Sequence, residues 1–190
     1  IKFEGNKKLI EQEMMLYSSA KNENFKPTSM ADITKLRQEI AIKKIPQILD
    51  YVNDTLENEG KLIIFAHHKE VIQTLEKELS KNNKVVKIDG SVSQEERQNA
   101  VDEFQKGTAN IFIGSIRACS EAITLTASNH VIFAEIDWTP GKNIQAEDRA
   151  YRIGQKNTVN ITYLVYENSV DEYILNTNIT KEEVINTVLK

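Results

Sequence analysis

Apolar residues in the first third of the chain recur at the spacing of a helix. Those between positions 9 and 16 predict one short helix, and the polar stretch 21–28 predicts a loop. From Ser29 to Glu59 apolar side chains return every three or four residues, so this segment is predicted to be helical up to Gly60. Pro46 is expected either to kink this segment or to begin a second helix.

Beyond Gly60 the pattern changes to short apolar runs separated by amphipathic segments. The segments between the runs carry helical signals, among them a capping box that begins at Ser93. Strands that alternate with helices predict an α/β fold, in which a parallel sheet carries helices on both faces. Ligands of such folds bind beyond the carboxyl ends of the strands. The runs of strand length lie at 62–65, 85–88, 111–113, 131–134 and 158–166.

Composition limits the kinds of function that the chain can have. Apolar residues make up 40 % and charged residues 27 % of the 190 residues, as in ordinary globular domains. No apolar run approaches the roughly 20 residues that span a bilayer, so no membrane association is expected. The single cysteine, Cys119, excludes an internal disulfide framework and a cysteine-based zinc cluster. We therefore expect an intracellular, reducing location and no metal site.

The stretch 145–155 carries the strongest chemical signal. A helix is predicted from about Lys142 to Ile153, and on it Gln145, Arg149 and Arg152 are spaced i, i+4, i+7 and share one stripe. The residues expected to face the core from this helix are Ala146, Ala150 and Ile153.

Two neighbouring arginines repel each other unless an anion lies between them. A guanidinium is a planar fork that suits phosphate oxygens. The alternative is that Arg149 and Arg152 pair with carboxylates such as Glu147 and Asp148, as surface arginines commonly do at little energetic gain. Their spacing alone leaves both interpretations open, and surface pairing is the commoner case.

The string Q-A-x-x-R-x-x-R-I-G-Q at 145–155 resembles motif VI of Swi/Snf-type ATPases in helicase superfamily 2. Other segments resemble further motifs of that family, in the family's order. Within the family, the strings FAHHK and QAEDR most resemble the annealing-helicase (HepA-related) branch. The resemblance covers about residues 33–175, and its further segments are KLIIFAHHK at 61–69, IDGS at 88–91, the stretch 113–126 and W-T-P-G at 138–141.

The resemblance implies the C-terminal RecA-like lobe of a two-lobe, ATP-driven DNA translocase. In that family, two arginines of motif VI reach the γ-phosphate of ATP held by the first lobe. By position these are Arg149 and Arg152, with Gln145 as a nearby site residue. Ala122 and Thr124 match ATP-binding positions of motif V, where the wider family more often has Gly and Asn.

The parts that hold ATP most directly are missing from the sequence. The chain has no G-x-x-x-x-G-K-[S/T] loop for phosphates and no D-E-x-H-like box for Mg²⁺. ATP with Mg²⁺ is therefore expected to bind mainly to a first lobe that precedes Ile1 in the full protein, and the chain alone is expected to be inactive. The expected parts are a helical extension or linker from that lobe at 1–58, the RecA-like lobe at 59–168 and C-terminal helices at 169–190.

Loops after the predicted strands hold candidate contacts to the phosphate backbone of double-stranded DNA. The net charge of −4 argues against tight binding by this chain alone, so a local patch and the partner lobe must share the contact. Gly90 and Ser91 alternatively form only the turn that leads to Ser93, and Trp138 is expected to pack rather than to stack on bases. The candidates are His68, Lys69, Gly90, Ser91, Ser115 and Arg117.

Two other functions compete with that of a motor lobe. One is a non-catalytic docking module for nucleic acid or protein on the same fold, which would not need both Arg149 and Arg152. The other is an RNA helicase lobe, against which the R-I-G-Q ending and the W-x-P link argue. The location is expected to be nuclear in a eukaryote and cytoplasmic in a bacterium or virus.

Overall fold

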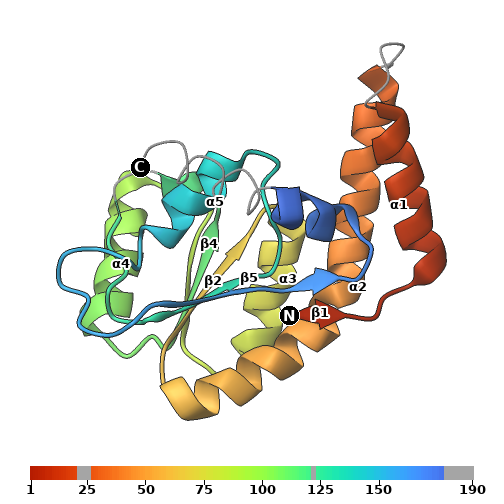
Figure 1. Ribbon diagram of the computed structural model, residues 1–190. Coiled ribbons are helices and arrows are strands. Elements are labelled where there is room, and N and C mark those ends of the chain that lie inside the picture. Colours follow the sequence, from red (N-terminus) through yellow and green to blue (C-terminus); the bar gives the residue numbers. More distant parts are fainter. Residues whose placement is uncertain (21–26, 121–122, 178–190) are drawn as a thin grey trace, which may run out of the picture.

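A five-stranded parallel sheet forms the centre of the molecule (Figure 1). The computed structural model describes residues 1–20, 27–120 and 123–177. The strand order is β3-β4-β2-β5-β6, and every neighbouring pair is parallel. This sheet confirms the predicted α/β fold. Its strands are β2 (Leu62–Ala66), β3 (Val85–Ile88), β4 (Ile111–Ser115), β5 (His130–Phe133) and β6 (Asn160–Tyr163).

Helices cover both faces of the sheet, which explains why its central strands are mainly apolar. Successive side chains of a strand point to opposite faces. Accordingly, Leu62 and Ile64 of β2 belong to one buried cluster, while Ile63 and Phe65 belong to the other. The helices on the first face are α2 (Pro27–Glu59) and α3 (Lys69–Leu79), and those on the second are α4 (Gln94–Lys106) and α5 (Pro140–Glu147).

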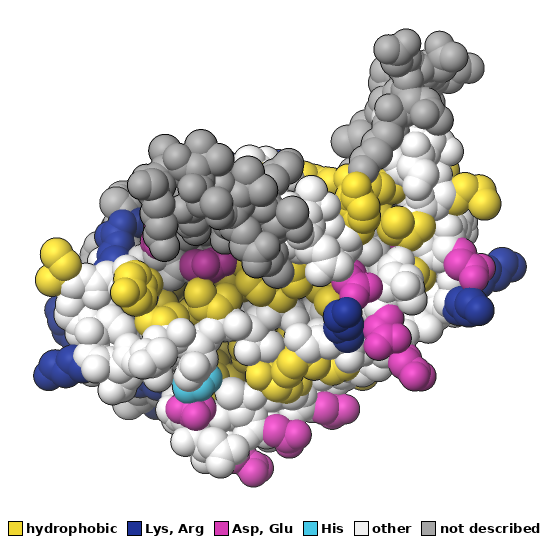
Figure 2. Space-filling view, viewed as in Figure 1, with side chains coloured by type: hydrophobic (Ala, Val, Ile, Leu, Met, Phe, Trp, Pro, Cys, Tyr) yellow, Lys and Arg dark blue, Asp and Glu magenta, His cyan; other side chains and the backbone are white. Residues whose placement is uncertain are grey.

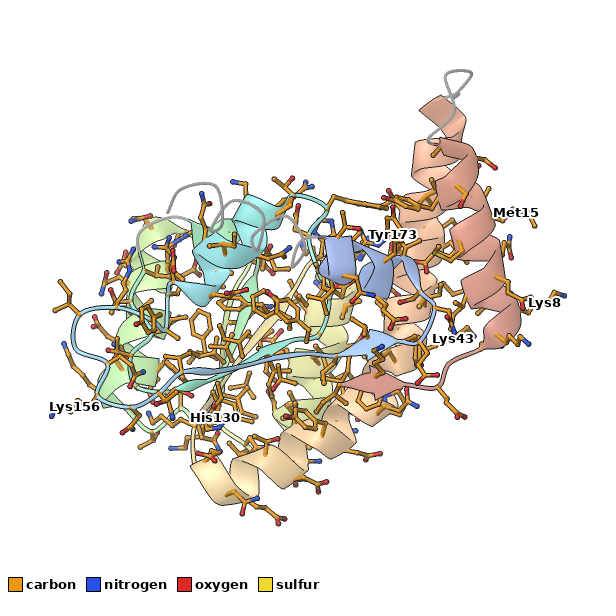
Figure 3. All side chains as sticks on the ribbon, in the orientation of Figure 1. Lys8, Met15, Lys43, His130, Lys156 and Tyr173 are labelled. Atoms are coloured by element: carbon orange, nitrogen blue, oxygen red, sulfur yellow. The ribbon has the colours of Figure 1, made fainter. Side chains whose placement is uncertain are left out.

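The predicted N-terminal helix is confirmed as α1 (Lys7–Ala20), which packs along α2. Ile10 of α1 is buried against Leu36 and Ile40 of α2. Figure 3 shows Lys8 and Met15 on the outer side of this helical hairpin, and Met15 is 70 % exposed. The two helices therefore bury one shared apolar seam and leave the opposite side of α1 open to solvent.

Two expectations for the N-terminal half are modified. Pro46 lies inside α2, so no second helix begins there. Most of the predicted loop, 21–26, lies outside the described residues, and α2 already begins at Pro27. Its end is as expected, because Gly60 follows with φ +75°, a value that glycine adopts without strain.

The predicted fifth strand is divided into two, which belong to different sheets. β6 pairs with β5, whereas β7 (Val165–Tyr166) pairs in parallel with β1 (Lys2–Phe3), a short strand that was not predicted. Leu164 separates the two strands, and its carbonyl accepts a hydrogen bond from the buried Lys44 ammonium at 2.6 Å. The pairing of β1 with β7 therefore joins the N-terminal strand to a segment more than 160 residues further along the chain.

The chain continues into a further helix over 170–177, as the Ser169 signal predicted. The hydroxyl of Ser169 accepts a hydrogen bond from the backbone N–H of Glu172 at 3.2 Å. The second signal, at Thr180, lies outside the described residues. Among the helices described, none is long and apolar enough to cross a membrane.

Candidate functional site

The helix predicted for 142–153 is confirmed only up to Glu147, because the segment after α5 does not continue as a helix. α5 ends at Glu147, and residues 148–154 form turns. The carbonyl of Arg149 accepts the backbone N–H of Leu125 at 2.8 Å. This bond ties the segment, here called the arginine turn, to the chain that leads into β5. It also uses a carbonyl that a continuing helix would have needed.

The single stripe of polar side chains expected on this helix is consequently absent from the arginine turn. Ala146 and Ala150 are buried in the core as predicted. Ile153, which was also expected in the core, is fully exposed, and Tyr151 is 72 % exposed. The turn thus keeps the small residues inside and moves two large apolar side chains to the surface.

The arginine turn still places Arg149 and Arg152 close together. The Nε of Arg149 donates to the carbonyl of Gln145 at 2.8 Å, and the residue is only 7 % exposed. Nη1 of Arg152 donates to the hydroxyl of Thr124 at 3.3 Å. Burial and then the charge of Arg152 lower the pKa of Arg149. An anion between two partly buried guanidinium groups would offset their mutual repulsion.

Among the charges that act on Arg149, a nearby carboxylate opposes the effect of burial and of Arg152. Asp148 raises the pKa of Arg149, yet the pKa stays lowered on balance. Glu147 accepts a hydrogen bond from the hydroxyl of Tyr163. Of the other predicted ATP-binding residues, Gln145 has an exposed side chain and Ala122 lies outside the described residues.

A second group of functional candidates gathers around Glu135, directly after β5. One carboxylate oxygen of Glu135 accepts the backbone N–H groups of His67 and His68, each at 2.8 Å. The other lies 2.5 Å from the Nδ1 of His68. Glu135 is 2 % exposed. The predicted candidate His68 is therefore held by a buried carboxylate at the carboxyl end of β2.

Asp137, two residues further on, holds the loop after β4. Its Oδ2 lies 3.1 Å from the Nε of Arg117 and 3.2 Å from the Nδ1 of His67. Its Oδ1 accepts the backbone N–H of Thr139 at 2.9 Å. Burial alone would raise the pKa of Asp137, but these donors hold the pKa well below its usual range. Asp137 therefore remains charged at neutral pH.

The remaining DNA candidates lie at the ends of β3 and β4 and at the start of α3. Gly90 and Lys69 are exposed, and Ser115 is half-buried. The backbone N–H and the hydroxyl of Ser91 both donate to the carboxylate of Asp89, at 2.8 and 2.5 Å. Ser91 thus uses within the turn the two groups that it was expected to offer to a phosphate.

Metal chemistry finds no support among residues 1–20, 27–120 and 123–177. No group of three or more His, Cys, Asp or Glu side chains in this part of the chain could hold a metal ion. Burial raises the pKa of Cys119 to about 12, which keeps its thiol protonated and unreactive.

A family model described as "Helicase conserved C-terminal domain" matches residues 41–154, which is more than half of the chain. The chain belongs to this family. The match begins within α2 and ends in the arginine turn, so it includes the strand-end loops and both arginines. The helicase C-terminal domain thus contains all of the candidate groups described above.

Curated proteins from several animals are similar to this helicase C-terminal domain. The human protein named DNA annealing helicase and endonuclease ZRANB3 is 42 % identical over 147 residues, which are 76 % of this chain and 14 % of that protein. A SWI/SNF-related matrix-associated actin-dependent regulator of chromatin subfamily A-like protein 1 from Xenopus tropicalis is 41 % identical over 134 residues, 69 % of this chain and 14 % of that protein. The matched region is thus 14 % of the length of either relative.

A solved structure supports the same assignment of fold. The crystal structure of the C-terminal part of the Fun30 ATPase domain matches with a TM-score of 0.64 and 33 % sequence identity, over 70 % of this chain and 44 % of that one. The fold is therefore the RecA-like C-terminal lobe of Swi/Snf-type ATPases. The resemblance of the sequence to the annealing-helicase branch is confirmed by the relatives.

Trp138 of this helicase C-terminal domain packs as expected. Its ring stacks on Tyr17 with centroids 5.6 Å apart, and the guanidinium of Arg37 lies 4.1 Å from the ring centroid. Arg37 is 4 % exposed and also donates to the carbonyl of Ile136 at 2.8 Å. Trp138 therefore joins the loop after β5 to α1 and α2.

Sequence reasoning did not foresee the role of the two carboxylates after β5. Neither Glu135 nor Asp137 was identified from the sequence as a candidate site residue. The available signal was two acidic residues directly after an apolar strand, at the edge where ligands of parallel sheets bind. Their partners are far away in the sequence, so the signal could not say what they hold.

Proposed function

We propose that the chain is the second motor lobe of an ATP-dependent double-stranded-DNA translocase or remodeller of the annealing-helicase type. The observation that carries the proposal is the arginine turn, in which Arg149 lies close enough to Arg152 for their charges to interact and Arg152 donates to the hydroxyl of Thr124. Both arginines would contact the γ-phosphate of ATP that a first lobe binds with Mg²⁺. Gln145 and the segment with Ala122 and Thr124 would lie around the nucleotide.

The chemistry required of this lobe is electrostatic. Charge spreads over the transferred phosphoryl group in the transition state, and a correctly placed arginine typically accelerates the step by about 10³–10⁵. A γ-phosphate between Arg149 and Arg152 would also relieve the repulsion that now lowers the pKa of Arg149. The arrangement is thus more favourable with the anion than without it.

Contact with DNA would use the loops at the carboxyl ends of the strands. The side chain of Arg117 is 65 % exposed although its Nε is bound to Asp137, so a phosphate can reach it. The other proposed contacts are His68, Lys69, Gly90, Ser115 and Ser91, the last of which would have to exchange its bonds to Asp89 for bonds to a phosphate. All would bind the phosphate backbone, so no preference for base sequence is expected. The naming of one relative as a DNA annealing helicase supports DNA as the polymer.

The division into parts and the location are also proposals. Residues 1–58 would form the helical extension from the first lobe, 59–168 the RecA-like lobe and 169–190 the C-terminal helices. Opening and closing of the two lobes with each ATP hydrolysed would move the protein along DNA. The naming of one relative as a regulator of chromatin supports a nuclear location in a eukaryote.

The test compares ATP hydrolysis by the 190-residue chain with that of the full-length protein. Each is measured without nucleic acid, with duplex DNA and with single-stranded RNA. We expect hydrolysis by the chain alone to stay at background, because the phosphate-binding loop and Mg²⁺ ligands are absent from it. The full-length protein should be stimulated about tenfold or more by duplex DNA, and much less by single-stranded RNA.

Other outcomes favour the competing functions. Stimulation by RNA in preference to duplex DNA would assign the chain to an RNA helicase. No hydrolysis by the full-length protein under any of the three conditions, together with retained binding of nucleic acid, would indicate a docking module. Either result would contradict the motor-lobe proposal.

A further inference from the structure

We infer that Glu135 and Asp137, here called the acidic pair, position the DNA-facing loops relative to the arginine turn, so that contact with DNA is transmitted to Arg149 and Arg152. This inference rests on the proposed function and adds to it a role for two residues that contact neither DNA nor ATP. Both are almost completely buried, at 2 % and 1 % exposure.

The first step is the attachment of the loop after β2. Glu135 binds the backbone of this loop at two consecutive amides, those of His67 and His68. Because backbone groups are held, the carboxylate fixes the path of the loop and not merely one side chain. β2 and β5 are neighbours in the sheet, so Glu135 spans two adjacent strand ends.

The second step is the attachment of Arg117, which follows β4. The side chain of Asp137 is 1 % exposed, whereas that of Arg117 is 65 % exposed. One end of this ion pair is thus buried among donors, and the other lies at the surface. A charge-assisted bond to a buried carboxylate is stronger and better oriented than an exposed pair. Movement of Arg117 on binding DNA would therefore act on Asp137.

The third step connects Asp137 to the arginine turn through Asn143 of α5. The amide oxygen of Asn143 accepts the N–H of Asp137 at 2.9 Å, and its amide nitrogen donates to the carbonyl of Asp137 at 3.0 Å. Asn143 is 3 % exposed. α5 then leads to Gln145, whose carbonyl accepts the Nε of Arg149. A path made of these hydrogen bonds and the backbone of α5 therefore connects Arg117 to Arg149.

The dependence of ATP hydrolysis on DNA distinguishes a positioning role of the acidic pair from a merely structural one. A structural role would lower hydrolysis by the same factor with and without DNA, because less folded protein would be present. A positioning role lowers chiefly the response to DNA. The ratio of DNA-stimulated to basal hydrolysis, and the DNA concentration at half-maximal stimulation, are therefore the decisive quantities.

The experiment measures both quantities in the full-length protein carrying Asp137→Asn. An asparagine keeps the size of the side chain but removes the charge and turns an N–H group toward neighbouring donors. We expect the stimulated rate to fall about tenfold or more, the half-maximal DNA concentration to rise, and the KM for ATP to stay within about twofold. Asp102→Asn, at an exposed carboxylate of α4 that pairs with Lys106, is the matched control and should change none of these values.

A double substitution tests whether Asp137 acts through Arg117. If it does, Arg117→Ala combined with Asp137→Asn should lower stimulation no further than the more severe single substitution. Additive losses would overturn the inference. Equal losses of basal and stimulated hydrolysis, or no loss at all, would overturn it as well.

Arg117→Lys covers the case in which Asp137→Asn does not fold. Lysine keeps a positive charge for a phosphate but lacks the Nε–H that binds Asp137. We expect it to reduce the response to DNA severalfold, and an unchanged response would contradict the inference. Arg149→Ala is measured alongside. If that variant hydrolyses ATP normally, the proposed function itself fails, whereas loss with Arg149→Ala and not with the Asp137 or Arg117 variants refutes only the acidic pair.

Discussion

Glu13 illustrates at the residue scale how this fold treats a buried charge. It is 2 % exposed on α1, and its carboxylate accepts the backbone N–H of Val170 at 3.0 Å. Burial, followed by the charge of Asp171, raises the pKa of Glu13 to about 7, and Arg37 and Lys44 offset this only in part. The folded chain therefore favours the protonated carboxyl group.

Replacement of Glu13 by glutamine should change how stability depends on pH. The folded pKa of about 7 lies above the ordinary value of 4.5, so the folded chain binds this proton more tightly. The resulting stabilisation is complete below about pH 4.5 and is lost as pH rises through 7, by about 3 kcal/mol at most. Glu13→Gln should remove this decline, as urea unfolding between pH 4.5 and 8 would show.

The matched control for this prediction is Glu11→Gln, at an exposed position of the same helix. Its stability should follow that of the unmodified chain across the whole range. Parallel curves for the unmodified chain and Glu13→Gln would contradict the assignment of the raised pKa to Glu13.

Single residues differ in how far the sequence reveals their role. Arg149 and Arg152 were identified because their motif is contiguous in the chain. Asp137 was not, because its partners Arg117 and His67 come from two other strand ends that only the folded sheet brings near it. Long-range polar contacts of this kind leave no local periodicity from which to infer them.

At the scale of elements, α4 is the helix whose start the sequence predicts most directly. The hydroxyl of Ser93 accepts the N–H of Glu96 at 3.3 Å, and the Glu96 carboxylate accepts the N–H of Ser93 at 2.9 Å. All the groups involved lie within four consecutive residues, so the capping box could be recognised without knowledge of the fold.

Removal of this cap should weaken the domain measurably. Ser93→Ala leaves the N–H of Glu96 without its side-chain acceptor and should lower the free energy of unfolding by about 1 kcal/mol. Chemical denaturation followed by circular dichroism would measure the change. Ser80→Ala, at the C-terminal end of α3, is the control. The unpaired N–H groups of a helix lie at its N-terminal end, so the Ser80 hydroxyl cannot accept a hydrogen bond from them. Equal effects of both substitutions would contradict the role of the cap.

α5 and β7 show why the bounds of other elements were predicted incorrectly. The apolar spacing in 142–153 suits a helix, but the N–H of Leu125 binds the carbonyl of Arg149 and the helix stops at Glu147. Likewise, the alternating pattern of 158–166 contains no sign that Leu164 separates two strands. In both cases a distant backbone partner overrides a correct local pattern.

At the scale of the whole molecule, the alternation of strands and helices was sufficient to predict the sheet. Parallel strands buried on both faces must be apolar throughout, and this pattern is visible in the sequence. The attachment of the N-terminal segment was not visible. β1 pairs with β7 more than 160 residues away, and Arg37 of α2 packs on Trp138 after β5. The strand order likewise depends on tertiary contacts between distant segments.

Figure 2 shows how hydrophobic and charged side chains are distributed over one face of the molecule. Hydrophobic side chains extend across the middle of the face shown, with acidic side chains at several places around them. On this side, a groove of about 540 Å³ between α5 and β6 is lined in part by Ile144, Ile161 and Tyr163. Neither feature of this face suits a DNA backbone.

The central claim is that this lobe supplies two arginines to ATP held elsewhere. The measurement that tests it most directly is DNA-stimulated ATP hydrolysis by the full-length protein carrying Arg149→Ala or Arg152→Ala, with ATP binding measured in parallel. We predict that each substitution lowers the rate by about 10³-fold or more while ATP still binds and the protein remains folded. Hydrolysis at the unmodified rate in both variants would contradict the claim, and the arginine turn would then have to be regarded as part of a binding module.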